Sequence, residues 1–310
     1  MKPNIIFFGT PDFGVTILKK LVENDFSPSL IVTVPDQPEG RDQALAPPAV
    51  KVEALEQGIP VSQPEKVSEI EQYIKELSPD LIVLAAYGHI IPSSVLAIPP
   101  KGSLNVHPSM LPLFRGSSPV QTAILQGAET TGVSIMLMDE KIDHGPILLQ
   151  KELATPLSSL SYTKAKEELA QLGGDLLAQV IPQWIEGSLT PTDQDHTKAT
   201  TTEQLTRDDG KIDWTTSAEE IERKVRALNP WPGTFTFANE KRMKIIDAQI
   251  LEGIPQRPVG STYAGPDGTI AVVTATDTLL ISELQLEGKK AMKSKEFLLG
   301  NTDFIGTVLK

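Results

Sequence analysis

Three polar side chains of this sequence are of the types needed to move an acyl group to an amine. Asn105 and His107 are two positions apart in the predicted strand 102–107, so their side chains would share one face. Asp143 follows in a loop. An amide and a protonated imidazole can stabilise the negative charge that grows on a carbonyl oxygen, and a carboxylate can accept the proton that an attacking amine loses. We therefore predict acyl transfer without a covalent intermediate.

The histidines support this interpretation unequally. On its own, His107 would be interpreted as a core or capping residue. With Asn105 on the same face, a catalytic role and a structural role are evenly balanced. His89 lies in a strand-end loop, where it would line the same pocket or be exposed. We expect His144 to be a bystander and His196 to be solvated. The four histidines have no metal-binding spacing such as His-Glu-x-x-His, so no metal is predicted.

The elements that would position these residues alternate between apolar strands and helices. Strands are expected at 4–9, 30–34, 80–86, 102–107, 131–138 and 145–153, and helices at 12–23, from 48, 67–77, 117–126 and 162–186. The βαβ opening predicts an α/β fold with a parallel sheet, and ligands bind such sheets beyond the carboxyl ends of the strands. The turn from Gly9 to Gly14 lacks the Gly-x-Gly-x-x-Gly spacing, which argues against a nicotinamide cofactor.

The second part of the chain has a different pattern. Residues 188–206 are polar and without apolar periodicity, and we interpret them as a linker between a catalytic domain at 1–187 and a second domain at 207–310. Ser217 with Glu220 forms the capping-box pattern of a helix start. A helix at 218–227 and short alternating strands near 234–238, 243–250, 269–274 and 278–285 are expected next. These strands predict a small β-barrel.

Composition narrows the class of protein. The chain has no cysteine, which excludes disulfides, a thiolate nucleophile and Cys-ligated metals. No apolar run is long enough for a membrane helix and no signal peptide opens the chain, so we expect a cytoplasmic protein without membrane contact. The net charge of −12 argues against nucleic acid, but residues 1–206 carry 14 basic and 25 acidic side chains, whereas 207–310 carry 14 and 15. The cations of the second half cluster at 241–244 and 289–295, although clusters this short are usually solvated faces.

Several longer motifs resemble those of the folate-dependent formyltransferases. The stretch that begins at Asn105 is similar to the family signature and reads Asn-Val-His-Pro-Ser-Met-Leu-Pro-Leu-Phe-Arg-Gly-Ser-Ser-Pro. The segment 131–139, Thr-Gly-Val-Ser-Ile-Met-Leu-Met-Asp, extends the resemblance. Further motifs resemble the branch of the family that acts on methionyl-tRNA, and they lie at 9–13, 35–41, 209–214, 226–232 and 288–292. The resemblance covers nearly the whole chain.

This resemblance implies a Rossmann-like catalytic domain, followed by an OB-like barrel that binds tRNA. It implies that 10-formyltetrahydrofolate gives its formyl group to the amine of methionine on the initiator tRNA, and that the enzyme is a monomer. The catalytic residues it implies are Asn105, His107 and Asp143. The residues it implies for folate binding are Ser109, Met110, Leu111, Pro112, Tyr87 and Gly88, and those for tRNA binding are Arg41, Arg115, Lys241, Lys289 and Lys290.

The sequence departs from the family pattern at three places. Leu113 stands where a basic residue is frequent, and His144 stands where a threonine is common. After Arg41 the chain continues with Asp42, Gln43 and Ala44, where more lysine is expected. Each lost phosphate contact would weaken tRNA binding and flatten its salt dependence.

Three other functions fit parts of the pattern. The same chemistry could act on an amino-sugar nucleotide or on glycinamide ribonucleotide, but the latter reaction needs only the first domain. A non-catalytic RNA-binding protein would have no use for Asn105, His107 and Asp143 together. An oxidoreductase is disfavoured by the missing glycine fingerprint.

Overall fold

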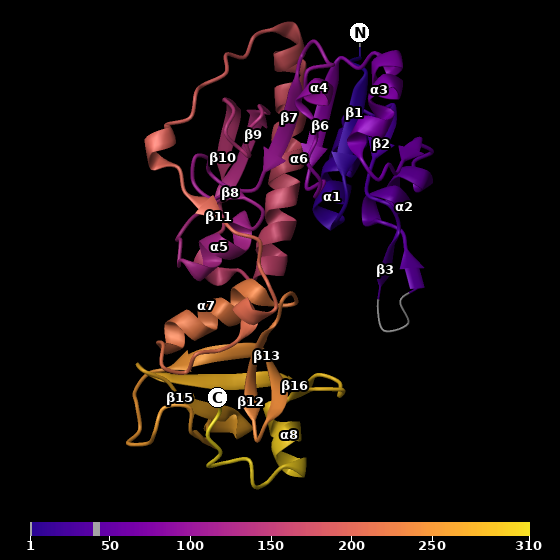
Figure 1. Cartoon of the computed structure of the whole chain (residues 1–310). Helices are drawn as coiled ribbons and strands as arrows, with labels where there is room; N and C mark the ends of the chain where they lie inside the picture. The colour runs from indigo at the N-terminus through magenta and orange to yellow at the C-terminus, as the bar shows by residue number, and fades with distance from the viewer. Residues whose placement is uncertain (1, 40–43) are drawn as a thin grey trace. The chain divides into compact units, whose positions relative to one another are not determined.

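The computed structural model describes residues 2–39 and 44–310, and the chain separates into two compact units. Unit 1 comprises Met1–Pro119, Thr130–Pro156 and Ala165–Thr202. Unit 2 comprises Val120–Glu129, Leu157–Lys164 and Glu203–Lys310. Figure 1 labels the elements of both units.

Unit 1 is built on a seven-stranded sheet of order β10-β9-β7-β6-β1-β2-β5. Its strands are β1 (Ile5–Gly9), β2 (Leu30–Val32), β5 (Val61–Ser62), β6 (Leu81–Ala85), β7 (Ser103–His107), β9 (Gly132–Leu137) and β10 (Ile147–Glu152). The first five of these are parallel, whereas β9 is antiparallel to both β7 and β10. The prediction of a mostly parallel α/β sheet is confirmed.

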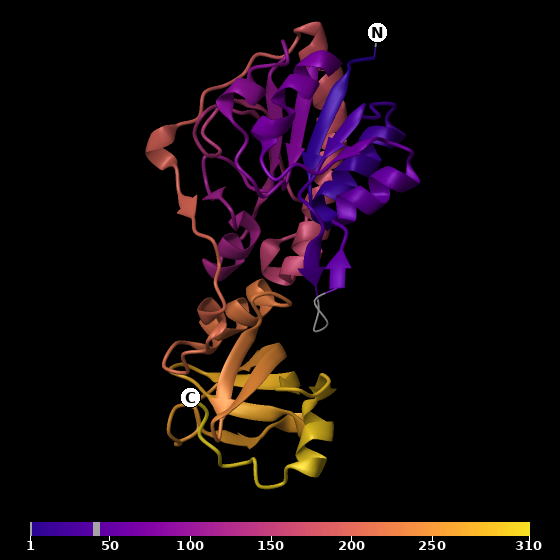
Figure 2. The same cartoon turned by 45° about the vertical axis from the view of Figure 1, so that its right-hand side comes forward.

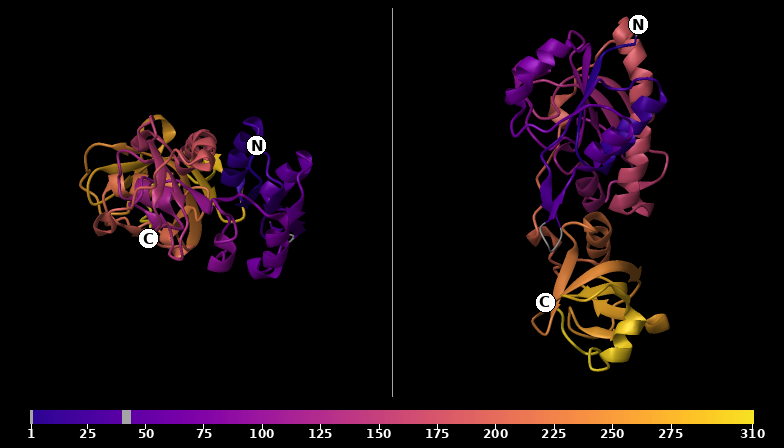
Figure 3. Two further views of the ribbon diagram at one scale, coloured as in Figure 1. Left: turned by 90° about the horizontal axis from the view of Figure 1, so that it is seen from above. Right: turned by 90° about the vertical axis from the view of Figure 1, so that its right-hand side faces the viewer.

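Helices cover both faces of this sheet, as the right-hand view of Figure 3 shows. One face packs against η1 (Val67–Ile70), α3 (Glu71–Leu77) and α4 (Ser93–Leu96). The other face packs against α1 (Asp12–Glu23), with α2 (Ala49–Glu56) beside it, and α6 (Tyr162–Glu186). Because both faces are covered, the central strands β1 and β6 are apolar throughout instead of alternating.

Alternation along β7 separates its two sets of side chains. Asn105 is in register with Leu84 of β6, whose face packs against η1, α3 and α4. Val106 faces α6, where a Cβ atom added to Gly173 would lie 2.8 Å from its Cγ1 atom. The amide of Asn105 and the imidazole of His107 therefore lie on the sheet face opposite α6.

The segment predicted as a linker is largely ordered on unit 1. Its residues 192–202, called the connector below, include η3 (His196–Lys198) and β11 (Thr201–Thr202). Thr192 forms an antiparallel bridge with Ile147, and β11 pairs in parallel with β8 (Arg115–Gly116). Figures 1 and 2 show η3 and β11 on the side of unit 1 that carries β8 and β10. The structure thus differs from the expected linker. Backbone pairing with β8 and with the first residue of β10 orders this segment, although its sequence has no apolar periodicity.

Unit 1 also contains a hairpin of β3 (Gln37–Glu39) and β4 (Ala44–Ala46). The predicted tRNA-binding residue Arg41 lies outside the described residues. Unit 2 includes α5 (Pro119–Leu125) from Val120 onward and η2 (Leu157–Ser159). Within the described chain, no helix is both long and apolar enough to cross a membrane.

The remainder of unit 2 is an antiparallel β domain. Its elements are η4 (Asp208–Gly210), α7 (Ala218–Leu228), β12 (Thr234–Ala238), β13 (Lys241–Leu251), β14 (Thr262–Ala264), η5 (Pro266–Gly268), β15 (Ile270–Val273), β16 (Thr278–Leu286), β17 (Met292–Lys293) and α8 (Ser294–Gly300). The sheet runs β12-β13-β16-β15-β14, with β17 paired to β16. The predicted capping box is present, because Ser217 and Glu220 exchange side-chain-to-backbone hydrogen bonds at the start of α7.

Residues 307–310 join the two edges of this sheet. The backbones of Lys310 and Phe237 on β12 exchange two hydrogen bonds of 3.0 and 2.9 Å. The N–H of Leu309 donates to the carbonyl of Gly260, and Thr262 on β14 donates to Thr307. The strands therefore surround one apolar core in the way the predicted small barrel requires.

Candidate active site

The three side chains singled out in the sequence meet at the carboxyl end of β7. The Asn105 amide Nδ2 donates to Asp143 Oδ1 at 3.0 Å, and His107 Nδ1 lies 3.5 Å from Asp143 Oδ2. Asn105 and His107 are 7% and 3% exposed, and the Asp143 side chain is 12% exposed. Amide, imidazole and carboxylate thus form one cluster with restricted access to water.

The contacts of the His107 ring show which of its two nitrogens donates to the protein backbone. Its Nε2 atom lies 3.0 Å from the carbonyl oxygen of Phe114, which can only accept a hydrogen bond. Nε2 therefore carries a proton and is occupied. Nδ1 faces Asp143, so a second proton on the ring would complete an ion pair with this carboxylate. The Nδ1–H of the imidazolium is the donor that can also serve a substrate oxygen.

Asp143 is held in an uncommon backbone conformation. It is a non-glycine residue with φ of 48°, in the loop between β9 and β10. Besides the amide of Asn105, its carboxylate accepts the backbone N–H of Gly116 on Oδ2 at 2.9 Å. Two donors and the facing imidazole therefore fix the direction of the carboxylate, and it is within reach of a proton released between the three residues.

The predicted folate loop at 109–112 is fixed by a hydroxyl and an amide from the sheet. Ser134 on β9 donates to the carbonyl of Ser109 at 2.6 Å and accepts the N–H of Leu111 at 3.1 Å. Gln150 on β10 donates to the carbonyl of Leu111 at 2.8 Å. Ser109 and Leu111 are buried, whereas Met110 and Pro112 are half-buried. The loop thus presents a preformed surface next to His107.

Tyr87, predicted to contact folate, has its side chain in the core. It is 1% exposed, and its ring packs edge-on against Phe8 at 5.2 Å and His89 at 5.7 Å. Its hydroxyl has no hydrogen-bond partner among the described residues, and burial raises the pKa of Tyr87 to about 12. The next residue, Gly88, is exposed, and its φ of 90° favours glycine.

Arg115, predicted to bind tRNA, faces the protein interior instead. It is 8% exposed, and its Nε and Nη2 atoms donate to Gln194 Oε1 at 3.1 and 2.6 Å. Nη2 also lies 2.8 Å from His196 Nδ1. Two of the three guanidinium nitrogens are thus bonded within the protein, and the expected tRNA contact of Arg115 stays a prediction. Gln194 itself was not identified from the sequence, because a single glutamine in a polar segment carries no periodic signal.

His144, which was expected to be a bystander, and His196, which was expected to be solvated, are in contact. The rings of His144 and His196 stack with centroids 4.0 Å apart and an interplanar angle of 8°. His144 Nδ1 lies 2.6 Å from Asp139 Oδ2. Because arginine can only donate, His196 accepts on Nδ1 from Arg115. This stack connects the Asp143 loop to the connector.

The predicted cationic residues of unit 2 lie on its surface. Lys241, Lys289 and Lys290 are exposed. The neighbouring Arg242 places its guanidinium carbon 3.7 Å from the ring centroid of Phe235, which is the geometry of a cation–π contact.

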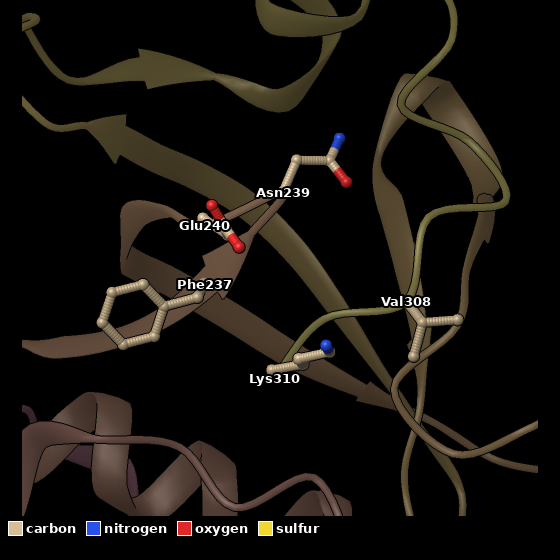
Figure 4. Close-up of a pocket in the computed structure, with 5 residues that line it drawn as sticks. All are labelled: Phe237, Asn239, Glu240, Val308 and Lys310. Atoms are coloured by element: carbon tan, nitrogen blue, oxygen red, sulfur yellow. The ribbon is translucent and has the colours of Figure 1, made fainter.

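A pocket of about 760 Å³ opens on the barrel of unit 2, and its lining includes Phe237, Glu240 and Lys310 (Figure 4). Figure 4 shows Glu240 on the turn between β12 and β13, with Lys310 on the neighbouring C-terminal segment. It contains no histidine, and the cluster of Asn105, His107 and Asp143 belongs to unit 1. This pocket is therefore separate from the candidate active site. Across residues 2–39 and 44–310, no group of three or more His, Cys, Asp or Glu side chains is arranged to hold a metal ion.

Two family models match the chain. The model described as formyl transferase matches residues 1–181, and the model described as formyl transferase, C-terminal domain, matches residues 204–302. A methionyl-tRNA formyltransferase of Chloroflexus aurantiacus is 40% identical over 302 residues, which cover 96% of this chain and 96% of that protein. The similarity extends through both units.

Solved structures share the fold at lower identity. HypX from Aquifex aeolicus, in complex with tetrahydrofolic acid, matches with a TM-score of 0.67 and 17% identity over 98% of this chain and 48% of that one. This chain thus spans about half the length of HypX. The N-formyltransferase of Helicobacter canadensis, in complex with folinic acid and dTDP-3-aminofucose, matches with a TM-score of 0.67 and 17% identity over 91% and 98% of the two chains. Likeness at this level concerns the fold alone.

Proposed function

Since this chain belongs to the methionyl-tRNA formyltransferase family, we propose that it transfers the formyl group of 10-formyltetrahydrofolate to the amino group of methionine on the initiator tRNA. This reaction is a step of translation initiation. The observation that carries the proposal is the placement of one carboxylate, that of Asp143, against both Asn105 and His107.

The geometry supports direct attack of the amine on the formyl carbon. As the new C–N bond forms, negative charge grows on the formyl oxygen, and two donors are available for it. Asn105 uses one N–H on Asp143 and retains a second, and His107 offers Nδ1–H. The amine gives its proton to Asp143. When the bond to N10 of the folate breaks, that nitrogen takes up the proton that Asp143 accepted from the amine, so charge and atoms balance without an acyl-enzyme and Asp143 is ionised again.

The residues around this centre support a binding scheme for both substrates. We assign folate to the fixed loop of Ser109, Met110, Leu111 and Pro112 and to the backbone at 87–88, with the buried Tyr87 ring as support beneath it. Exposed cations of unit 2 at Lys241, Lys289 and Lys290, together with Arg41, would contact tRNA phosphates. We also propose that the enzyme uses no metal and works as a monomer in the cytoplasm.

The proposal is tested by supplying the purified protein with 10-formyltetrahydrofolate and methionyl initiator tRNA and measuring formylmethionine. We expect turnover, and we expect Asp143→Asn to lower kcat by roughly 10²–10⁴-fold, because the proton acceptor is lost while the shape is kept. An amino-sugar nucleotide supplied as the acceptor serves as the comparison. Formylation of the sugar but not of methionyl-tRNA, or full activity of Asp143→Asn, would overturn the assignment.

A further inference from the structure

We propose that Gln194 of the connector is a positioning residue for Asp143, and that the connector holds the catalytic loops of unit 1 in their working geometry. This inference rests on the proposed function, because it assigns Asp143 a role in the reaction. The connector contributes no group that touches Asn105 or the carboxylate of Asp143 directly. Its hydrogen bonds reach the backbone on which these groups depend.

Gln194 is bonded on both ends of its amide. Its Nε2 atom donates to the carbonyl oxygen of Asp143 at 2.9 Å and to that of Gly145 at 2.7 Å. Its Oε1 atom accepts two hydrogen bonds from Arg115. The residue is 6% exposed, and its bonds to Gly145 and Arg115 are buried, whereas the bond to Asp143 is partly buried. A buried amide that uses both hydrogens on one loop fixes the path of that loop.

The Asp143 backbone needs such support. A residue with φ of 48° is in the left-handed region, which is sparsely populated by residues other than glycine. Aspartate tolerates this region better than most residues, partly because its side chain can bond to nearby backbone. Here the carboxylate is turned to Asn105 and Gly116 instead. Gln194 supplies the bond that holds the Asp143 peptide in this orientation.

A second contact of the connector reaches the carboxylate through β8. Thr202 on β11 is the register partner of Gly116, whose N–H donates to Asp143 Oδ2. Gly116 has φ of 113°, and a Cβ atom added to it would lie 2.6 Å from the carbonyl oxygen of Thr202. The close pairing of β8 with β11 therefore sets the position of the N–H that orients the carboxylate.

A third contact reaches the imidazole. The hydroxyl of Thr200 accepts the N–H of Phe114 at 2.8 Å, and the carbonyl of Phe114 faces His107 Nε2 at 3.0 Å. Phe114 also has a positive φ, of 59°. The connector thus supports the partners of both Asp143 and His107 from one side. Misplacement of reacting groups by about 1 Å can cost 100-fold in rate, so these bonds bear on kcat.

The test is the substitution Gln194→Glu. It keeps the size of the side chain and the acceptor for Arg115, but it replaces the two N–H bonds with a carboxylate oxygen against the carbonyls of Asp143 and Gly145. We expect kcat to fall by roughly 10–100-fold, with the KM values for folate and tRNA changed less than threefold. The matched control is Gln183→Glu, since the Nε2 atom of this exposed glutamine on α6 also donates to a backbone carbonyl. It should retain wild-type kcat.

A double-mutant cycle separates positioning from general structural damage. If Gln194 acts through Asp143, Gln194→Glu should lower kcat by less than threefold in an Asp143→Asn background. An equal fall in both backgrounds, a wild-type kcat, or a change confined to KM would overturn the inference. If a circular dichroism melt shows that Gln194→Glu does not fold, the same double-mutant cycle is measured with Gln194→Met, which introduces no charge. The proposed function fails separately, if the wild type makes no formylmethionine or Asp143→Asn is fully active.

Discussion

Exchanging Asn105 for aspartate tests the electrostatics of the site directly. The substitution preserves shape, but it removes the two N–H donors and places a second carboxylate where Nδ2 now lies 3.0 Å from Asp143 Oδ1. Two full negative charges at this distance repel by about 5 kcal/mol at an effective dielectric constant of about 20. The two carboxyl groups are therefore expected to share one proton near neutral pH.

Two consequences of this change can be measured. Loss of a donor to the developing oxyanion should lower kcat by roughly 10²–10³-fold, which is about 2.7–4 kcal/mol of transition-state stabilisation. The shared proton should also move the acidic limb of the kcat–pH profile to higher pH, because the pair must lose it before one carboxylate can accept the amine proton.

The variant Asn105→Ala serves as the control for this experiment. It removes the donor without adding a charge, so it should show the loss in kcat, and its acidic limb should move less than that of Asn105→Asp, because Asp143 loses one hydrogen bond but gains no neighbouring carboxylate. Steady-state formylation between about pH 5 and 9 reports both quantities. A kcat within threefold of wild type for Asn105→Asp, or the same pH profile for both variants, would refute the role given to this amide.

Two further predictions concern unit 2. Ser217→Ala should lower the unfolding free energy by about 1 kcal/mol at pH 7, measured by urea denaturation. The backbone N–H and hydroxyl of Ser217 hold the Glu220 pKa below its usual value of 4.5, so the bond from the hydroxyl to the carboxylate contributes above that pH and is lost as pH falls through the lowered pKa. The bond from the Glu220 N–H to the Ser217 hydroxyl remains at any pH, so Ser217→Ala should cost less, but not nothing, at pH 3, and an equal cost at pH 3 and pH 7 would contradict this. Replacing both Lys289 and Lys290 with alanine should weaken tRNA binding and flatten the slope of log Kd against log salt by about 2, and an unchanged slope would remove these lysines from the interface.

Local sequence patterns correctly predicted features that lie within a single strand or helix. The two-residue period along β7 placed Asn105 and His107 on one face, and the structure has them so. The capping box of Ser217 and Glu220 marked the start of α7 because cap and partner are three positions apart. In these cases the residues that determine the local structure are close together in the sequence, so their spacing is enough to predict it.

Local sequence patterns could not predict the contacts between segments that are far apart in the sequence. Arg115 and Gln194 are 79 positions apart, and Gln194 and Asp143 are 51 positions apart. A polar run without periodicity predicted a linker, but pairing of β11 with β8 orders it. The resemblance placed Tyr87 at the folate pocket, and its place after a strand does not reveal that its ring turns into the core.

The catalytic geometry is itself a product of these distant contacts. Phe114, Gly116 and Asp143 all have positive φ, and the first and last do so with a side chain present. Such conformations persist only where the surrounding structure over-determines them. Thr200, Thr202 and Gln194 supply such bonds from one segment of the chain. Loss of these bonds should therefore lower the rate of formyl transfer before it lowers the cooperativity of unfolding, because β7, which carries Asn105 and His107, pairs with β6 and β9, whereas the connector pairs with β8 and with the first residue of the edge strand β10.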